Sequence, residues 1–243
     1  MNWDVNRGWE LLSVDASVVD ALVSRHELDK LTATILARRG VTRPVEVEAF
    51  LGRCWLPSTQ IDGMRAAVNR VCCCRGQQVY VFGDPDVDGI AATALLVEMF
   101  RRLGARVRWR IRSGLCRASG TSDLRLAEEK EAKLIVVVES MIRWPEIKDE
   151  VHGGCDVLVV GSRSPLHDTD PSVFILNHVM STRDNSNQLA TSAVVMKLAQ
   201  AVHDVSVEKV DRSSLEVPYD LSTLGTLAAH VPLTGENRDI IVR

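Results

Sequence analysis

Hydrophobic and polar residues follow two periods along the chain, and these periods predict alternating strands and helices. Short apolar runs rich in β-branched residues predict buried strands at residues 78–82, 132–138, 156–160 and 173–176. Longer stretches with helical patterning predict helices at 90–103, 123–133, 145–151, 189–203 and 219–229. Continuous apolar strands separated by helices are typical of parallel sheets covered on both faces. The predicted fold class is therefore α/β, with a doubly wound, mainly parallel sheet.

The first part of the chain carries a different pattern. Apolar residues recur at near-helical spacing over 18–39, and Pro44 marks a new helix start. We expect Trp3 and Trp9 to pack on the body of the protein. The predicted organisation is a helical N-terminal segment at 1–75, packed on an α/β domain at 76–243.

The stretch 77–104 is the centre of this pattern. Its strand ends in an acidic turn with Asp84, Asp86 and Asp88, and a helix closed by Gly104 follows. Carboxylates at the end of a strand occupy the place where open α/β sheets bind ligands, and a divalent cation relieves their mutual repulsion. A calcium-binding EF-hand is excluded, since that loop needs a Glu at its twelfth position and a preceding helix. Here the twelfth residue is Leu95, and the preceding element is the predicted strand.

Seven arginines and no acidic residue lie between positions 101 and 117. Strict alternation predicts a strand whose cationic face holds four of them, namely Arg106, Arg108, Arg110 and Arg112. Its other face would hold Val107, Trp109 and Ile111. Two interpretations are open: an edge strand whose charges discourage aggregation, or a phosphate-binding surface.

The composition of the chain excludes only a few classes of function. The net charge of −3 means that any nucleic-acid binding must rest on a local patch. The chain has neither a membrane-length apolar run nor a basic, apolar-cored leader, so we expect a soluble, cytoplasmic protein without a membrane partner. Its six cysteines lack zinc-site spacing and are expected to be reduced thiols.

The segment FGDPDVDGIAATALL resembles the first motif of the RecJ branch of the DHH phosphoesterases, GDYDxDGxTATALL. Segments at 35–41, 49–51 and 224–238 resemble RecJ segments in the same order. The resemblance implies a DHH domain that cleaves phosphodiesters with divalent metals, on single-stranded DNA as a 5′→3′ exonuclease. It also leads us to expect that the family's second, DHHA1-type domain is absent.

Catalytic motifs are only partly retained. The resemblance carries over Asp84, Asp86 and Asp88 as catalytic residues, and it places Glu139 where the second motif has Asp. The Asp-His-His motif falls on Gly161, Ser162 and Arg163, and the fourth-motif Asp falls on Ala229. We therefore expect at most one weakly bound Mn²⁺ or Mg²⁺, held by Asp84, Asp86 and Glu139. His167, Asp168 and His230 are poorly placed to replace the missing ligands.

The leading hypothesis is a single-stranded nucleic-acid-binding protein of DNA replication or repair, with an inactive or crippled nuclease centre. A degenerate domain of this family serves as such a scaffold in the eukaryotic replicative helicase. The resemblance favours phosphate contact for the arginine-bearing strand, and it adds two further phosphate-binding candidates, Arg163 and Arg238.

Two alternatives remain at this stage. One is an active metal-dependent exonuclease with substituted ligands, and the other is a phosphodiesterase for small phosphoesters or cyclic dinucleotides. The expected partners are single-stranded DNA and either a replication or repair protein or a separate chain that supplies the missing domain.

Overall fold

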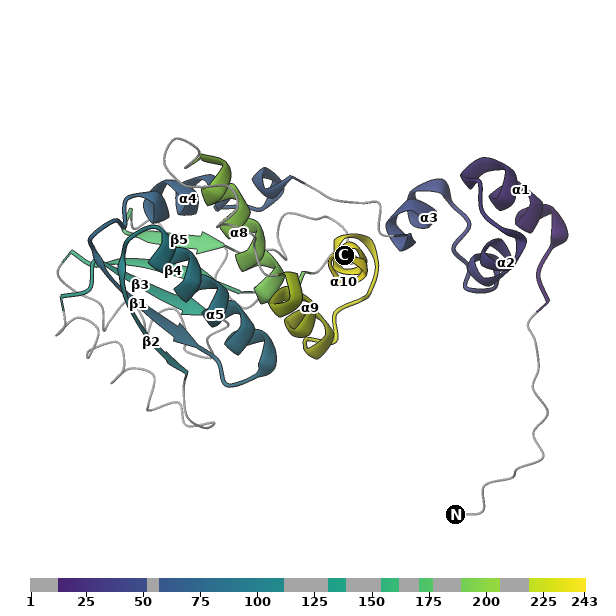
Figure 1. Cartoon of the computed structure of the whole chain (residues 1–243). Helices are drawn as coiled ribbons and strands as arrows, with labels where there is room; N and C mark the ends of the chain where they lie inside the picture. The colour runs from purple at the N-terminus through teal and green to yellow at the C-terminus, as the bar shows by residue number, and fades with distance from the viewer. Residues whose placement is uncertain are drawn as a thin grey trace, which may run out of the picture.

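A computed structural model describes residues 13–51, 57–111, 131–138, 154–161, 171–176, 189–205 and 219–243 of the chain. Within these ranges, five parallel strands form one sheet in the order β2-β1-β3-β4-β5 (Figure 1). The strands are β1 (Gln78–Gly83), β2 (Arg106–Ile111), β3 (Leu134–Val138), β4 (Asp156–Val160) and β5 (Val173–Leu176). The prediction of an α/β fold with a parallel sheet is confirmed.

The strand order fixes where the two halves of the sheet meet. The chain leaves β1 for β2 on one side and then returns to β3 on the other side of β1. The carboxyl end of β1 therefore lies at a topological switch point, where open α/β sheets bind their ligands.

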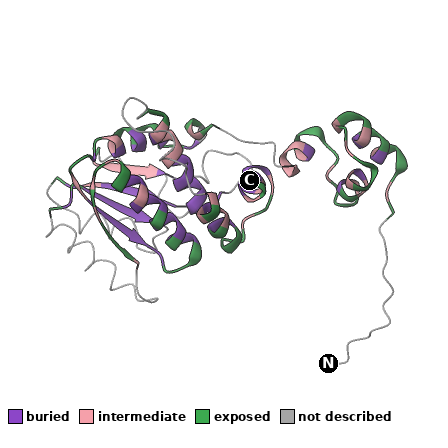
Figure 2. Cartoon of the chain, viewed as in Figure 1, coloured by how far each residue is buried: buried purple, intermediate pink, exposed green. Residues whose placement is uncertain are grey.

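Helices cover one face of this sheet. They are α4 (Met64–Cys72), α5 (Val87–Arg102) and α8 (Thr191–Val205), and their apolar residues form one core with Val79, Val136 and Leu158 of the sheet. Figure 2 shows the buried residues concentrated in the strands and in the helix faces turned toward them. On the opposite face, Tyr80, Phe82 and their neighbours on β3 and β4 form a second buried cluster. The predicted helices at 123–133 and 145–151 fall almost entirely outside the described residues.

Two more helices, α9 (Tyr219–Ala228) and α10 (Gly235–Val242), complete this part of the molecule. Helix α9 packs against α5 and α8. Lys197 of α8 forms a buried ion pair with Glu236 of α10, so α10 is attached to the body through a pair of opposite charges.

The N-terminal helices form a separate core. They are α1 (Ala16–His26), α2 (Lys30–Arg38) and α3 (Pro44–Phe50), and they bury Val19, Leu22, Leu36 and others among themselves. The helical stretch predicted at 18–39 is two helices, because Glu27 adopts a left-handed conformation (φ 54°) and Asp29 caps α2. Although α4 and the short 3₁₀ helix η1 (Ser58–Gln60) precede residue 75, α4 belongs to the core of the α/β sheet. Trp3 and Trp9 lie outside the described residues.

Helix α3 contacts the body at α10, where the guanidinium of Arg238 lies 4.5 Å from the centre of the Phe50 ring. The guanidinium of Arg39 lies 5.6 Å from the same ring. No helix among the described residues is both long and apolar enough to cross a membrane.

Candidate functional site

The acidic turn follows β1 directly and is closely packed. A Cβ atom at Gly83 would lie 2.0 Å from Thr93 Oγ1, and one at Gly89 would lie 2.7 Å from the backbone oxygen of Asp84. Both positions therefore require glycine, because any side chain would displace the backbone or the first turns of α5. This packing holds the buried Asp84 at the carboxyl end of β1, at the switch point of the sheet.

Asp86 and Asp88 have different surroundings within the same turn. Asp86 is exposed and caps α5, its carboxylate accepting a hydrogen bond of 2.7 Å from the Gly89 amide. The predicted start of this helix at Ile90 is three residues late, since the cap at Asp86 lets the helix begin at Val87. The Asp86 side chain thus closes the turn and faces solvent.

Asp88 is buried and joins two helices. Its Oδ2 accepts a hydrogen bond of 2.9 Å from the Thr191 amide, and its Oδ1 accepts one of 3.0 Å from the Ser192 amide. These amides belong to the first turn of α8, where unpaired N–H groups and the helix dipole favour a carboxylate. Ala190, which precedes α8, has no side-chain oxygen to cap it. Asp88 therefore serves as the N-terminal cap of α8, from a distant part of the sequence.

A glycine of α9 makes this arrangement possible. A Cβ atom at Gly225 would lie 2.2 Å from Ser192 Oγ and 2.6 Å from Asp88 Oδ1. Helix α9 can pack this closely only because position 225 lacks a side chain. This role of Asp88 was not predicted from the sequence. One signal was present, since a helix that starts after Leu189-Ala190 needs a capping group from elsewhere.

The family's remaining metal-ligand positions supply few donors here. Gly161, at the end of β4, has no side chain, and Ala229 is an exposed residue just past the end of α9. His230 follows it in a left-handed conformation (φ 53°). Glu139, Ser162, Arg163, His167 and Asp168 lie outside the described residues.

The donors in the described ranges do not form a metal centre by themselves. Among these residues, no group of three or more His, Cys, Asp or Glu side chains is placed to hold an ion. Both oxygens of Asp88 already accept backbone hydrogen bonds, and Asp86 accepts one. The weak site at Asp84, Asp86 and Glu139 therefore stays a prediction.

In the sheet that the described residues form, the arginine-bearing strand is an edge strand. Strand β2 pairs in parallel with β1, with Arg108 opposite Tyr80 and Arg110 opposite Phe82. Arg106, Arg108 and Arg110 are all exposed, while Val107 is half-buried against the core beside α5. The predicted strand is thus confirmed for 106–111, and Arg112 lies outside the described residues. The predicted alternation holds except at one apolar position, because Trp109 is 54% exposed.

Arg238 occupies a separate environment. Its guanidinium stacks on Phe50, between α10 and α3, and the residue is only partly exposed. The contact gives Arg238 a structural partner, and its predicted role in binding phosphate stays a prediction.

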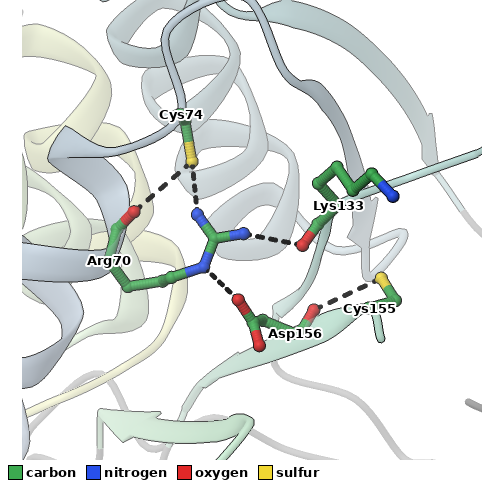
Figure 3. Close-up of polar contacts among 5 residues, drawn as sticks. All are labelled: Arg70, Cys74, Lys133, Cys155 and Asp156. Carbon is green, nitrogen blue, oxygen red and sulfur yellow. Dashed lines mark hydrogen bonds and ion pairs between the residues drawn. The ribbon is translucent and has the colours of Figure 1, made fainter. Parts of the chain in front are cut away.

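At the amino ends of the strands, a second polar cluster has a structural role (Figure 3). Arg70 of α4 forms an ion pair with Asp156 at the start of β4 and donates a hydrogen bond of 2.6 Å to the Lys133 carbonyl before β3. It also donates one of 3.2 Å to the Cys74 sulfur. Burial raises the pKa of the Cys74 thiol to about 11, so the sulfur stays protonated at neutral pH. Arg70 thereby connects α4 to β3 and β4 at the ends of the strands opposite the acidic turn.

Comparison with known proteins gives a consistent set of relatives. No family model matches the chain. The single-stranded-DNA-specific exonuclease RecJ of Bacillus subtilis is 26% identical over 240 residues, which cover 95% of this chain and 29% of that protein. The RecJ of Thermus thermophilus is 30% identical over 172 residues, which cover 69% of this chain and 24% of that protein. The chain thus spans about a quarter of the length of these curated relatives.

Solved structures agree with the sequence matches. RecJ from T. thermophilus in complex with Mn²⁺ superposes with a TM-score of 0.70 at 24% identity, over 94% of this chain and 33% of that one. A structure of exonuclease RecJ bound to manganese gives a TM-score of 0.61 at 24% identity, over 77% and 48%. These similarities establish a shared fold. Together with the curated matches and the retained acidic turn, they identify the chain as a RecJ-like member of the DHH superfamily.

Proposed function

We propose that this chain is a RecJ-like module that binds single-stranded nucleic acid and whose nuclease centre is inactive or crippled. The observation that carries the proposal is the row of exposed arginines on β2, at the edge of the sheet and beside the acidic turn. Strand β2, which carries this row, ends at Ile111, and Ile111 pairs with Gly83, the residue before Asp84.

Several features support binding to phosphates. Five of the eleven residues from Arg101 to Ile111 are arginine and none is acidic, although the whole chain carries a net charge of −3. Guanidinium groups bind phosphate in a bidentate fashion. The curated relatives are named as exonucleases specific for single-stranded DNA, which favours that polymer as the ligand.

Reduced catalysis is supported by the loss of ligand side chains. Gly161 and Ala229 stand where the family has metal ligands and offer no metal-binding atom from their side chains. Loss of a single ligand-orienting group typically lowers metal affinity or activity about 10–100-fold. Loss of several ligands should leave only background hydrolysis.

Binding is tested by fluorescence anisotropy with a labelled oligothymidylate over a range of salt concentrations. Each phosphate neutralised on a single strand contributes about −0.7 to the slope of log affinity against log salt. The Arg108→Ser/Arg110→Ser variant should bind more weakly and should have a slope flatter by about 1.4. The matched control is Arg25→Ser/Arg38→Ser, which removes the same charge from exposed positions on α1 and α2. Equal slopes in the two variants would contradict the proposal.

Catalysis is tested by the release of labelled nucleotides from a single strand in the presence of manganese. We expect no release above a blank, with an active RecJ as the positive control. Degradation that disappears in Asp86→Ala would instead support the alternative of a working exonuclease. Hydrolysis of a cyclic dinucleotide without binding to single strands would support the third hypothesis.

A further inference from the structure

Trp109 is exposed to an unusual degree for its position in β2. Its neighbours on the same face contact the body: Val107 packs against the core, and Ile111 Cδ1 lies 2.8 Å from where a Gly83 Cβ would be. Trp109 lies between them in sequence and is nevertheless 54% exposed. An indole combines a large apolar face with one N–H donor, and such side chains are enriched at binding surfaces.

The other aromatic residues near the arginines cannot serve as a binding surface. Tyr80 and Phe82 lie opposite Arg108 and Arg110 in β1, and their rings stack with centroids 4.6 Å apart. They are only 7% and 3% exposed, however, so they support the cationic face from within. Of these three rings, only that of Trp109 is accessible to a ligand.

The edge of the sheet joins the two faces of β2. In the described sheet, β2 pairs with β1 alone, so no further strand separates the arginine face from the Trp109 face along its outer side. Alternate residues of a parallel strand are about 6.6 Å apart, which is comparable to the separation of consecutive phosphates in an extended polynucleotide. The spacing of Arg106, Arg108 and Arg110 therefore suits three consecutive phosphates.

We propose that a single strand lies along the outer edge of β2, with phosphates at these three arginines and one unpaired base stacked on Trp109. The inference rests on the proposed function and specifies how the strand is held. Since every base has a π face, stacking on Trp109 tolerates any sequence, and since the base must be free, it excludes duplexes. The bound polynucleotide would run toward the carboxyl ends of the β-strands, because β2 ends beside Gly83 and the acidic turn.

The test separates stacking from phosphate contact. Wild type, Trp109→Leu and Trp109→Phe are compared for binding to an oligothymidylate and to an abasic strand of equal length, which keeps the phosphates and lacks the bases. Wild type should bind the oligothymidylate about tenfold more tightly than the abasic strand. Trp109→Leu should lose this preference while its salt slope stays unchanged, and Trp109→Phe should keep part of the preference.

Three outcomes would overturn the inference. If wild type and Trp109→Leu showed the same preference for the oligothymidylate over the abasic strand, the stacking residue would lie elsewhere. The proposed function would still be supported in that case if the Arg108→Ser/Arg110→Ser variant had a flatter salt slope. Binding of a polyglutamate peptide, with no binding of either strand, would assign the β2 edge to an acidic protein partner and would contradict the proposed function as well. Equally tight binding of duplex DNA would exclude stacking by an unpaired base.

Discussion

Replacing Asp88 with Asn tests whether this carboxylate caps α8 or belongs to a metal centre. The substitution keeps the shape of the side chain, but one of its two terminal atoms becomes an NH₂ group. That group cannot accept the hydrogen bond now made by the Thr191 or Ser192 amide, at 2.9 and 3.0 Å respectively. One buried amide of α8 would then lack an acceptor.

The expected loss of stability follows from these contacts. An unsatisfied buried N–H costs about 1–3 kcal/mol, and the remaining hydrogen bond loses the strength that comes from a charged acceptor. The N-terminus of α8 also loses a favourable negative charge, which contributes about 0.3–1 kcal/mol. We expect Asp88→Asn to lower the free energy of unfolding by about 3 kcal/mol. For a chain of this size, each kcal/mol corresponds to a decrease in Tm of about 2–4 °C.

Urea unfolding followed by circular dichroism measures this difference. The matched control is Asp86→Asn in the same turn, where the side chain is exposed and Asn caps a helix about as well as Asp does. Asp86→Asn should therefore be neutral to within about 0.5 kcal/mol. The capping role would be refuted if both variants unfolded at the same urea concentration as wild type. A metal role would be indicated if manganese stabilised wild type but not Asp88→Asn, because an ion that binds only the folded state stabilises it.

Three further predictions concern packing and burial. Gly225→Ala should lower the free energy of unfolding by about 1–3 kcal/mol, since its Cβ would lie 2.2 Å from Ser192 Oγ; a neutral effect in urea unfolding would mean that α9 can shift freely. Lys197→Met and Glu236→Leu should each cost about 3–5 kcal/mol by removing one member of a buried ion pair, and the double variant should cost far less than their sum, whereas additive losses would contradict this coupling. Iodoacetamide at pH 8 should label the exposed Cys73 of the native protein and leave Cys74 unlabelled. The reason is that burial holds the pKa of the Cys74 thiol at about 11 and only the thiolate reacts. Peptide mapping that finds Cys74 labelled first would disprove this prediction.

The parts of the fold that depend on local pattern were predictable from sequence. Strands β4 and β5 occupy the predicted ranges, because each is a continuous apolar run bounded by turn-forming residues. The break between α1 and α2 was not predicted, since the apolar spacing continues across it. That break depends on the left-handed conformation of Glu27 and on the side chain of Asp29, which apolar spacing does not report.

The candidate site was less predictable, because its contacts join distant segments. The sequence placed Asp84, Asp86 and Asp88 together in one turn, and the turn follows β1 as expected. It could not indicate that Asp88 would meet the amides of Thr191 and Ser192, which depends on how α5, α8 and α9 pack. The exposure of Trp109 likewise follows from the place of β2 at the edge of the sheet, and strict alternation alone predicted an apolar face turned inward.

The contact between Phe50 and Arg238 has a consequence for the order of events during synthesis. The two residues are 188 positions apart (238 − 50), and the whole α/β sheet lies between them in the sequence. At about 5–20 residues per second, the ribosome needs about 10–40 s to make that interval. Helices α1 to α3 pack their apolar residues against one another, so these contacts do not themselves require α10. The docking of α3 onto α10 is therefore one of the last contacts that the nascent chain can make.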